Sequence, residues 1–339
     1  MSLSIPKNPD LFDGSVIQVS RTDGSISPSS NEAWEGRAGL PNANGVPERA
    51  IAREGRIRTR PIVEADLDAV ASFLMQGFPR SNRQNWMEIF GRLAAHSAPE
   101  GFPTFGYMME SAGVPVGTIL LVSSILSTGD LRSSRCNLSS WYVLPAFRIY
   151  GHLFISRMLQ NENVTYVNVS PAPHTLPLLQ LQGFSRYCNG QFFAATATLR
   201  SFGGRGERIV PVREDDGVQS ATHERELLVA HAGFGCMSLW SVADEQAYPF
   251  VLRRRLVKGC IPCAQLIYCR SIDEFVRFFR PIAGYLARRG IPLVMMDSNG
   301  RIPGLIGMYI DGFLPKYFKG ASSPRLGDLA YTESALFGI

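Results

Sequence analysis

The 339-residue sequence contains no hydrophobic run long enough to cross a bilayer. A membrane-spanning helix needs about 20 consecutive apolar residues. The longest apolar stretch, Val116 to Leu126, is interrupted by glycine, threonine and serine residues. The sequence also begins without the basic and then apolar pattern of a signal peptide. We therefore expect a cytoplasmic protein with no membrane span.

An excess of one charge is also lacking. The chain has 34 Lys and Arg against 29 Asp and Glu, a net charge of +5. No stripe of basic and aromatic residues is present, and we interpret the arginine runs 253–255 and 288–289 as solvated surface. This composition argues against nucleic acid as a partner, but it permits a small anionic ligand such as a nucleotide.

Cysteine is scarce, with six scattered residues. Cys260 and Cys263 have a C-x-x-C spacing, but they lie between two strand-like runs and no second Cys/His pair is nearby. A redox pair would need the first cysteine at the start of a helix, and a zinc site would need two more ligands. We interpret the spacing as coincidence, with a redox or metal role as the alternative, and we expect no metal.

Apolar residues make up 45% of the chain, which suffices for two cores. Residues 1–55 are rich in Ser, Gly, Pro and Asn without periodicity and are interpreted as a flexible N-terminal arm. The Gly-rich stretch within 201–209 is interpreted as a linker. We therefore expect one domain at 56–200 and a second at 210–339.

Hydrophobic periodicity predicts an α/β protein with a similar element order in both domains. In the first domain we expect helices Val63–Phe78, Gly151–Gln160 and His174–Gln182, with strands Phe105–Glu110, Pro115–Leu126, Asn137–Leu144, Val164–Val169 and Gln191–Leu199. In the second we expect helix Thr222–Ala230, a helix capped by Ser271, strands Gly235–Val242, Phe250–Val257, Cys263–Cys269, Ile291–Met296 and Leu305–Asp311, and a closing run Asp328–Phe337.

The segment Trp141–Leu153 carries the clearest chemical signal. A strand ends at Pro145, and Arg148 and Gly151 then introduce a helix. The start of a helix offers unpaired N–H donors and the positive end of its dipole, which together suit a pyrophosphate. Gly151 would allow close backbone approach, and Arg148 would complement the negative charge. The end of the preceding strand could bind an extended ligand as an added strand does.

This segment resembles the central motif of the GNAT acyltransferase superfamily, which is Arg/Gln-x-x-Gly-x-Gly/Ala after a strand. The resemblance covers residues 57–200. It is supported by three further matches in the family's order, at Ile57–Leu67, Gly113–Gly117 and Gly183-Phe184. The resemblance implies a mixed, mostly antiparallel sheet flanked by helices. It also implies acetyl-CoA or another acyl-CoA as cosubstrate, and we expect the second domain to be a degenerate unit of the same kind.

Three positions depart from the family's pattern. Leu153 stands where the motif has Gly or Ala, so its side chain could hinder the approach of phosphates. Leu179 stands where a Tyr often protonates the leaving thiolate. The strand before the loop carries Asn137, Ser139 and Ser140 in place of a catalytic Glu. The family's acid and base are therefore both missing.

Other residues are candidate replacements. His174 could accept a proton and Tyr142 could donate one, although an exposed helix-start histidine and a packed strand tyrosine are the alternatives. Asp297 ends a strand before Ser-Asn-Gly and is interpreted as a turn residue, with an active carboxylate as the alternative. The resemblance implies that acyl-CoA contacts Tyr142, Val143, Arg148, Ile149, Tyr150, Gly151, His152 and Leu153.

The resulting expectation is an acyltransferase that moves an acyl group from acyl-CoA to an amine or hydroxyl of a small acceptor by direct transfer. The alternative is a catalytically degenerate GNAT-fold protein that acts as an acyl-CoA sensor or an interaction scaffold. We expect the second domain to lack a CoA site, because Asp273 and Glu274 open its central helix, and to shape the acceptor cleft of the first. The sequence leaves the acceptor, the acyl chain length and the oligomeric state open.

Overall fold

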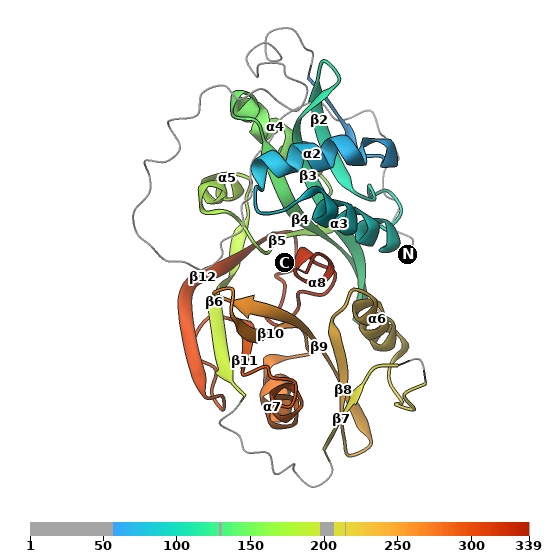
Figure 1. The fold of residues 1–339 in the computed structure, drawn as a ribbon, viewed down its shortest axis with the longest axis vertical. Coiled ribbons are helices and arrows are strands. Elements are labelled where there is room, and N and C mark those ends of the chain that lie inside the picture. Colours follow the sequence, from blue (N-terminus) through green and yellow to red (C-terminus); the bar gives the residue numbers. More distant parts are fainter. Residues whose placement is uncertain (1–56, 129–130, 197–206, 214, 339) are drawn as a thin grey trace. The chain divides into compact units, whose positions relative to one another are not determined.

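A computed structural model describes residues 57–128, 131–196, 207–213 and 215–338 of the chain (Figure 1). These residues form two units. The first contains the described residues up to Ile125 together with Ser134–Phe184, and the second contains Leu126–Ser133 and the chain from Ser185 onward. The predicted arm at 1–55 and most of the predicted linker lie outside the described residues.

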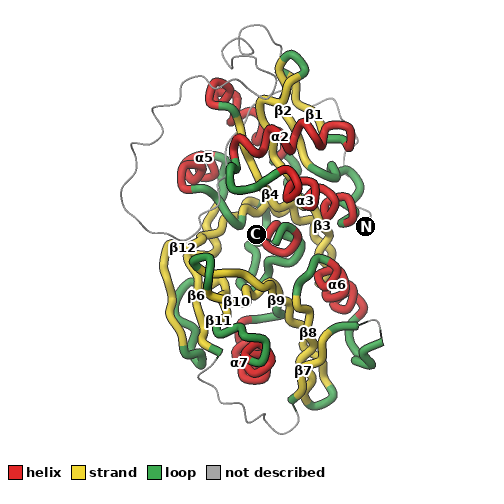
Figure 2. The backbone as a smooth tube through the Cα atoms, viewed as in Figure 1, coloured by secondary structure: helices red, strands yellow, loops and turns green. Residues whose placement is uncertain are grey.

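The first unit is a sheet with helices on its faces (Figure 2). Its strands lie in the order β1-β2-β3-β4-β5, with β1/β2 and β2/β3 antiparallel and β4/β5 parallel. The elements in chain order are β1 (Arg58–Pro61), α2 (Leu67–Gly77), α3 (Arg83–Ala95), β2 (Gly106–Ser111), β3 (Val114–Thr128), β4 (Leu131–Val143), α4 (Gly151–Met158), β5 (Val164–Asn168) and α5 (Leu176–Leu181).

The second unit repeats this pattern. Its strands lie in the order β7-β8-β9-β10-β11-β6-β12. The pairs β7/β8, β8/β9 and β9/β10 are antiparallel, and the parallel pair β10/β11 follows them. The elements in chain order are β6 (Ser185–Ala195), β7 (Arg208–Pro211), α6 (Thr222–Gly233), β8 (Met237–Ala243), β9 (Gln246–Val257), β10 (Ile261–Tyr268), α7 (Ile272–Ala287), β11 (Leu293–Ser298), β12 (Gly307–Lys319) and α8 (Glu333–Leu336).

Local sequence explains several of these elements. Asn82 caps α3 by accepting a hydrogen bond from the Asn85 amide at 2.9 Å, and Ser271 caps α7 by accepting from the Glu274 amide at 3.1 Å. Ala112 and Gly113 adopt φ of 50° and 75°, which matches the tight turn predicted between β2 and β3. The expected mixed α/β fold, with a mostly antiparallel sheet, is therefore confirmed.

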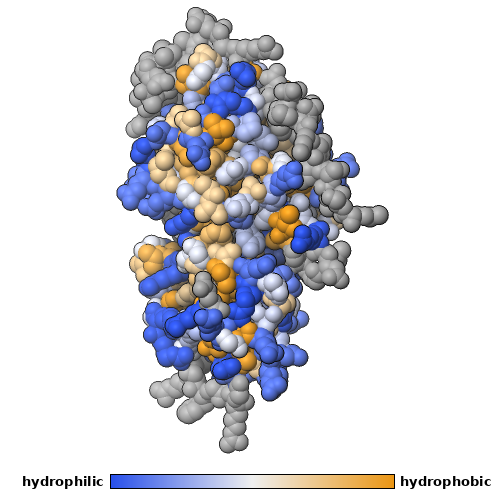
Figure 3. All heavy atoms as spheres, turned by 90° about the vertical axis from the view of Figure 1, so that its right-hand side faces the viewer, coloured by the Kyte–Doolittle hydropathy of each residue, from blue (hydrophilic) through white to orange (hydrophobic). Residues whose placement is uncertain are grey.

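The core of the second unit lies between α7 and its sheet. Phe275, Phe278 and Ile282 of α7 are fully buried and pack against Phe250 and Val294. Apolar side chains thus fill the interior, whereas the face drawn in Figure 3 shows small apolar patches among hydrophilic residues. Among the described residues, no helix combines the length and apolar character that crossing a membrane requires.

Some elements differ from the prediction. Helix α3 and strands β1 and β7 were not predicted. Strand β6 was predicted at Gln191–Leu199 but begins at Ser185 and hydrogen-bonds to β11 and β12, so it belongs to the second unit. The expected closing run at Asp328–Phe337 forms one isolated bridge and then α8. The assignment of domains at 56–200 and 210–339 stays a prediction.

A buried ion pair joins β11 to β12. Lys316 Nζ lies 2.8 Å from Asp297 Oδ1, and the two side chains are 1% and 2% exposed. The Gln191 Nε2 of β6 donates to the same oxygen at 2.9 Å. Because Val294 and Met296 of β11 face the core under α7, alternation turns Asp297 to the opposite face of the sheet. Asp297 was expected to act in a turn; instead it lies within β11 and pairs with Lys316.

We predict that Lys316→Met lowers the free energy of unfolding by about 3–5 kcal/mol, because it leaves the Asp297 carboxylate buried without its counter-charge. The double variant Asp297→Leu/Lys316→Met should recover most of that loss, since it removes both charges. Urea denaturation of the wild type, both single variants and the double variant measures the effect. A loss of less than about 1 kcal/mol in Lys316→Met and in Asp297→Leu would contradict the structural role of the pair.

Candidate functional site

In the first unit, β4 and β5 part before β4 ends. Their parallel pairing runs from Ser134↔Val164 to Asn137↔Val167. Strand β4 then continues to Val143, whereas β5 ends at Asn168. Ser140 interrupts β4 with a φ of 47°, which a non-glycine residue rarely adopts and which recurs at functional sites. Strand β4 therefore continues past the last residue that it pairs with β5, and an extended ligand along this stretch stays a prediction.

Neutral polar side chains are buried where the two strands part. Asn137, Ser139 and Asn168 are fully buried, and Ser140 is 5% exposed. Asn168 Oδ1 accepts a hydrogen bond from the Ser170 amide at 3.3 Å. Within the described part of the chain, Asn168 Nδ2 and the Trp141 Nε1 have no hydrogen-bond partner. A buried donor without a partner is costly, so these two groups suit a ligand or water that accepts hydrogen bonds.

The predicted phosphate loop forms a 3-10 turn at Pro145–Tyr150 that leads directly into α4. No side chain caps α4, and its first turn contains no acidic residue. Gly151, the first residue of the helix, is buried. The Gly151 amide donates to the Arg148 carbonyl oxygen within the preceding turn. What this helix start has in favour of an anion is therefore the positive end of its dipole and the lack of an acidic side chain.

The remaining loop residues face solvent. Arg148 and His152 are exposed, and the exposed fractions of Ile149, Tyr150 and Leu153 are 78%, 36% and 54%. The structure thus brings together the backbone of Gly151 and the exposed side chains around it. The assignment of each of these residues to acyl-CoA stays a prediction.

Tyr142 lies in the core against α2. It is 7% exposed, and its ring centroid is 5.0 Å from that of Phe73 and 6.4 Å from that of Phe78. Gly77, at the end of α2, makes room for the ring, since a Cβ at that position would overlap it. Val143, the other strand-end residue expected to contact the cofactor, is fully buried. The tyrosine ring is therefore held by packing, and its role as a proton donor stays a prediction.

His174, the other predicted catalytic residue, belongs to a 3-10 turn at Pro173–Thr175 before α5. The placement of its side chain lies outside what the structure describes. Leu179, at the position of the family's acid, is fully buried. This position therefore contributes to the core and offers no proton.

A thiol nucleophile on β4 is disfavoured. Cys136 is fully buried and accepts a hydrogen bond from Ser123 Oγ at 3.4 Å. Burial raises the pKa of its thiol to about 12. Because the thiolate is the nucleophilic form, Cys136 stays protonated near neutral pH and is unsuited to hold an acyl group.

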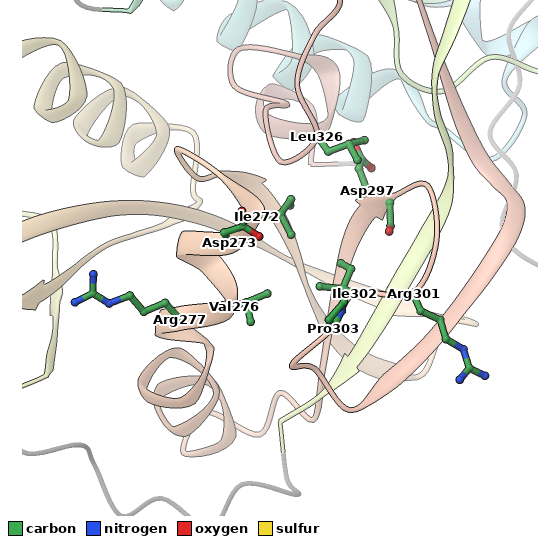
Figure 4. A pocket seen from close by; sticks show the side chains of 10 residues that line it. Ile272, Asp273, Val276, Arg277, Asp297, Arg301, Ile302, Pro303 and Leu326 are labelled. Atoms are coloured by element: carbon green, nitrogen blue, oxygen red, sulfur yellow. The ribbon is translucent and has the colours of Figure 1, made fainter.

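The start of α7 in the second unit differs from that of α4. Ser271 caps α7, and Asp273 and Glu274 lie in its first turn. Burial raises the pKa of the Glu274 carboxyl, but the turn remains acidic and would repel a pyrophosphate. A cavity of about 540 Å³ lies beside this turn (Figure 4), lined by Ile272, Asp273, Val276, Arg277, Asp297, Ser298, Arg301, Ile302, Pro303 and Leu326.

The C-x-x-C spacing corresponds to no paired site. Cys260 is exposed, Cys263 is buried within β10, and both are free. Burial raises the pKa of the Cys263 thiol to about 12, which opposes redox activity. In the described segments, no group of three or more His, Cys, Asp or Glu residues could hold a metal ion.

We predict that Gly77→Ala lowers the free energy of unfolding by about 1–3 kcal/mol, because the new Cβ displaces the Tyr142 ring. Gly91→Ala on α3 is the matched control, since a Cβ there meets nothing within 4 Å. That control should be stabilising by about 0.5–1 kcal/mol, as expected for Gly→Ala inside a helix. Thermal and urea unfolding measure both variants, and an equal effect on both would contradict the packing of Tyr142 on α2.

The sequence matches no family model and no curated protein. Solved structures nevertheless share its fold. A GCN5-related N-acetyltransferase from Anabaena variabilis superposes with a TM-score of 0.52 at 10% identity, over 78% of this chain and 72% of that one. One from Kribbella flavida has a TM-score of 0.52 at 13% identity, over 79% of this chain and 71% of that one. A conserved protein of unknown function from Enterococcus faecalis has a TM-score of 0.52 at 11% identity, with coverages of 81% and 74%. The chain therefore has the GNAT-superfamily fold.

Proposed function

We propose that the chain is an acyltransferase that moves an acyl group from acyl-CoA to an amine or hydroxyl of a small acceptor. The parting of β4 from β5 beside the uncapped start of α4 carries this proposal. The solved neighbours named as N-acetyltransferases support it at the level of the fold. Neither the strand parting nor the solved neighbours identify the acceptor or the length of the acyl chain.

The cosubstrate would bind along the end of β4 and at the start of α4. The backbone of Tyr142 and Val143 would hold the pantetheine arm as an added strand would. The loop from Arg148 to Leu153 would hold the pyrophosphate through the amides at the helix start, the dipole and the Arg148 charge. Exposed Ile149 would offer an apolar contact to the rest of the nucleotide.

The reaction would be a direct transfer. The acceptor nitrogen or oxygen attacks the thioester carbonyl, its bond to the acyl carbon forms, and the carbon–sulfur bond breaks. The acceptor loses one proton and the departing thiolate gains one, so the proton count balances. The protonated thiol of Cys136 supports transfer without an acyl-enzyme.

Orientation would supply much of the acceleration. The side chains at the strand parting are neutral, and holding two reactants in the correct geometry can by itself remove a large part of a barrier. We propose His174 as the group that takes the proton of the acceptor and Tyr142 as the group that protonates the thiolate.

The second candidate function is an acyl-CoA sensor or scaffold without catalysis. The buried leucine at position 179 favours it, because the family's acid position is part of the core. Both candidate functions require binding of acyl-CoA, but only the acyltransferase releases free CoA. The expectations that the second unit shapes the acceptor cleft and that the protein is cytoplasmic remain predictions.

Titration calorimetry with acetyl-CoA and longer acyl-CoAs, followed by detection of free CoA thiol with a panel of amines and alcohols, separates the candidates. Binding with acceptor-dependent thiol release supports the acyltransferase. Binding without release for any acceptor supports the sensor. No binding of any acyl-CoA would contradict both.

We predict that Gly151→Asp weakens acyl-CoA binding roughly 30-fold or more, because it places a carboxylate beside the phosphates. Gly151→Ala adds the Cβ without the charge, and the difference between the two variants isolates the electrostatic part. Gln160→Asp is the matched control, since it adds the same charge at an exposed position after the end of α4. Unchanged affinity in Gly151→Asp would place the ligand elsewhere.

We also predict that Leu153→Ala leaves acyl-CoA affinity equal or raises it, because it removes a branched side chain from the motif position that the family fills with Gly or Ala. Leu181→Ala on α5 is the control, since Leu181 is 68% exposed and its removal costs similar apolar surface. Calorimetry on the folded variants measures the effect. A large loss of affinity in Leu153→Ala alone would mean that Leu153 packs on the ligand.

A further inference from the structure

The second unit has its own parting of parallel strands. Strands β10 and β11 pair from Cys263↔Leu293 to Gln265↔Met295. Strand β10 then continues to Tyr268 and β11 to Ser298. This matches the parting of β4 from β5, with a helix start beside it in both units.

A segment near the C-terminus, residues 325–331, pairs with the end of β10. The Cys269 amide donates to Gly327 O at 3.0 Å, and the Leu329 amide donates to Ile267 O at 2.7 Å. Tyr268 and Asp328 form an antiparallel bridge between these two hydrogen bonds. The segment therefore docks as a short added strand, the mode by which sheets bind extended peptides.

The 325–331 segment occupies the edge of β10 that faces β11. Strand β9 takes the other edge, where Val251 is paired with Tyr268. Leu326 lines the cavity beside α7 together with Ile272 and Ser298. Since a strand has only two hydrogen-bonding edges, the segment lies in the gap that β11 leaves.

Arg325 ties this segment to the start of α7. Its guanidinium donates to the carbonyl oxygens of Cys269 and Arg270, the latter at 2.7 Å, and lies 5.0 Å from the centre of the Tyr268 ring. It also pairs with Asp328 at 3.6 Å. The carbonyls at the end of β10 are thus bound by the chain itself.

Gly327 fits this docking closely. Its φ is 78°, and an added Cβ would lie 2.7 Å from Cys269 Sγ and 3.1 Å from Ile272 Cδ1. A side chain would therefore be opposed both by the backbone conformation and by the neighbours. The position requires glycine for close approach to β10 and α7.

We propose that the 325–331 segment of the same chain closes the second unit, by filling the place beside β10 that an extended ligand would otherwise take. The segment takes the place beside β10 that corresponds to the proposed cosubstrate place beside β4. The comparison with acyl-CoA rests on the proposed function, whereas the docking of the segment rests on the contacts alone. The consequence is that each chain binds one acyl-CoA and the second unit binds none.

Hydrogen exchange of the full chain, without ligand, tests the docking. The amides of Cys269 and Leu329 should exchange slowly in the wild type. Gly327→Ala and Arg325→Ala should accelerate exchange at both amides together, at least about tenfold, because they loosen one shared contact. Gly217→Ala is the control, since Gly217 also has a positive φ, of 68°, but a Cβ there meets nothing within 4 Å. Arg280→Ala, at an exposed position on α7, controls for loss of a charge.

Fast exchange at these amides in the wild type, or acceleration at only one of them, would overturn the docking. Titration calorimetry with acetyl-CoA then gives the number of acetyl-CoA molecules bound per chain. One acetyl-CoA per chain supports the proposal, and two would overturn it. If no acyl-CoA binds at all, the proposed function fails, and the exchange result alone decides the docking.

Discussion

Buried backbone N–H and C=O groups must find hydrogen-bond partners, and this requirement is most demanding where two parallel strands part. Both units contain such a place, after Asn137 on β4 and after Gln265 on β10. In the second unit, the 325–331 segment bonds to Ile267 and Cys269. In the first, the proposed acyl-CoA would lie along the corresponding stretch. The parting of two parallel strands can therefore make room for a ligand in one unit and for a segment of the chain itself in the other.

The two central helices begin differently, although they follow equivalent strands. Helix α4 begins at Gly151 without a cap or an acidic residue, whereas α7 has the Ser271 cap and two carboxylates. A cap side chain and a phosphate would use the same orphan N–H donors. Capping stabilises α7 and occupies a donor that an anion would otherwise use, whereas α4 has no such cap.

Both units bury charged side chains, but at different places. The second unit buries the Asp297–Lys316 pair, which needs tight geometry to offset the loss of hydration. In the first unit, Arg135 on β4 is 3% exposed, whereas Asn137, Ser139, Ser140 and Asn168, which lie where the strands part, are neutral. A neutral site imposes no cost of burying ions, and it favours a reaction driven by orientation and backbone donors.

The sequence by itself determined the parts that depend on neighbours a few residues apart. Its periodicity and caps predicted α2, α7 and the β2–β3 turn, and the Arg148–Gly151 motif predicted the fold. Helix α3 was missed, although Asn82 and the spacing of Trp86, Ile89, Phe90 and Leu93 carry a helix signal. Helix α8 was missed because it spans only four residues, too few to show a helical period.

The tertiary structure alone decided which distant residues meet. Gln191 joins Asp297 across 106 positions, and Arg325 reaches Cys269 across 56. Hydrophobic periodicity describes one helix or strand at a time and gives no information about partners this far apart in the sequence. For this reason the sequence did not show that β6 pairs with β11 and β12, and it assigned Asp297 to a turn. It also gave no sign that the 325–331 segment pairs with β10.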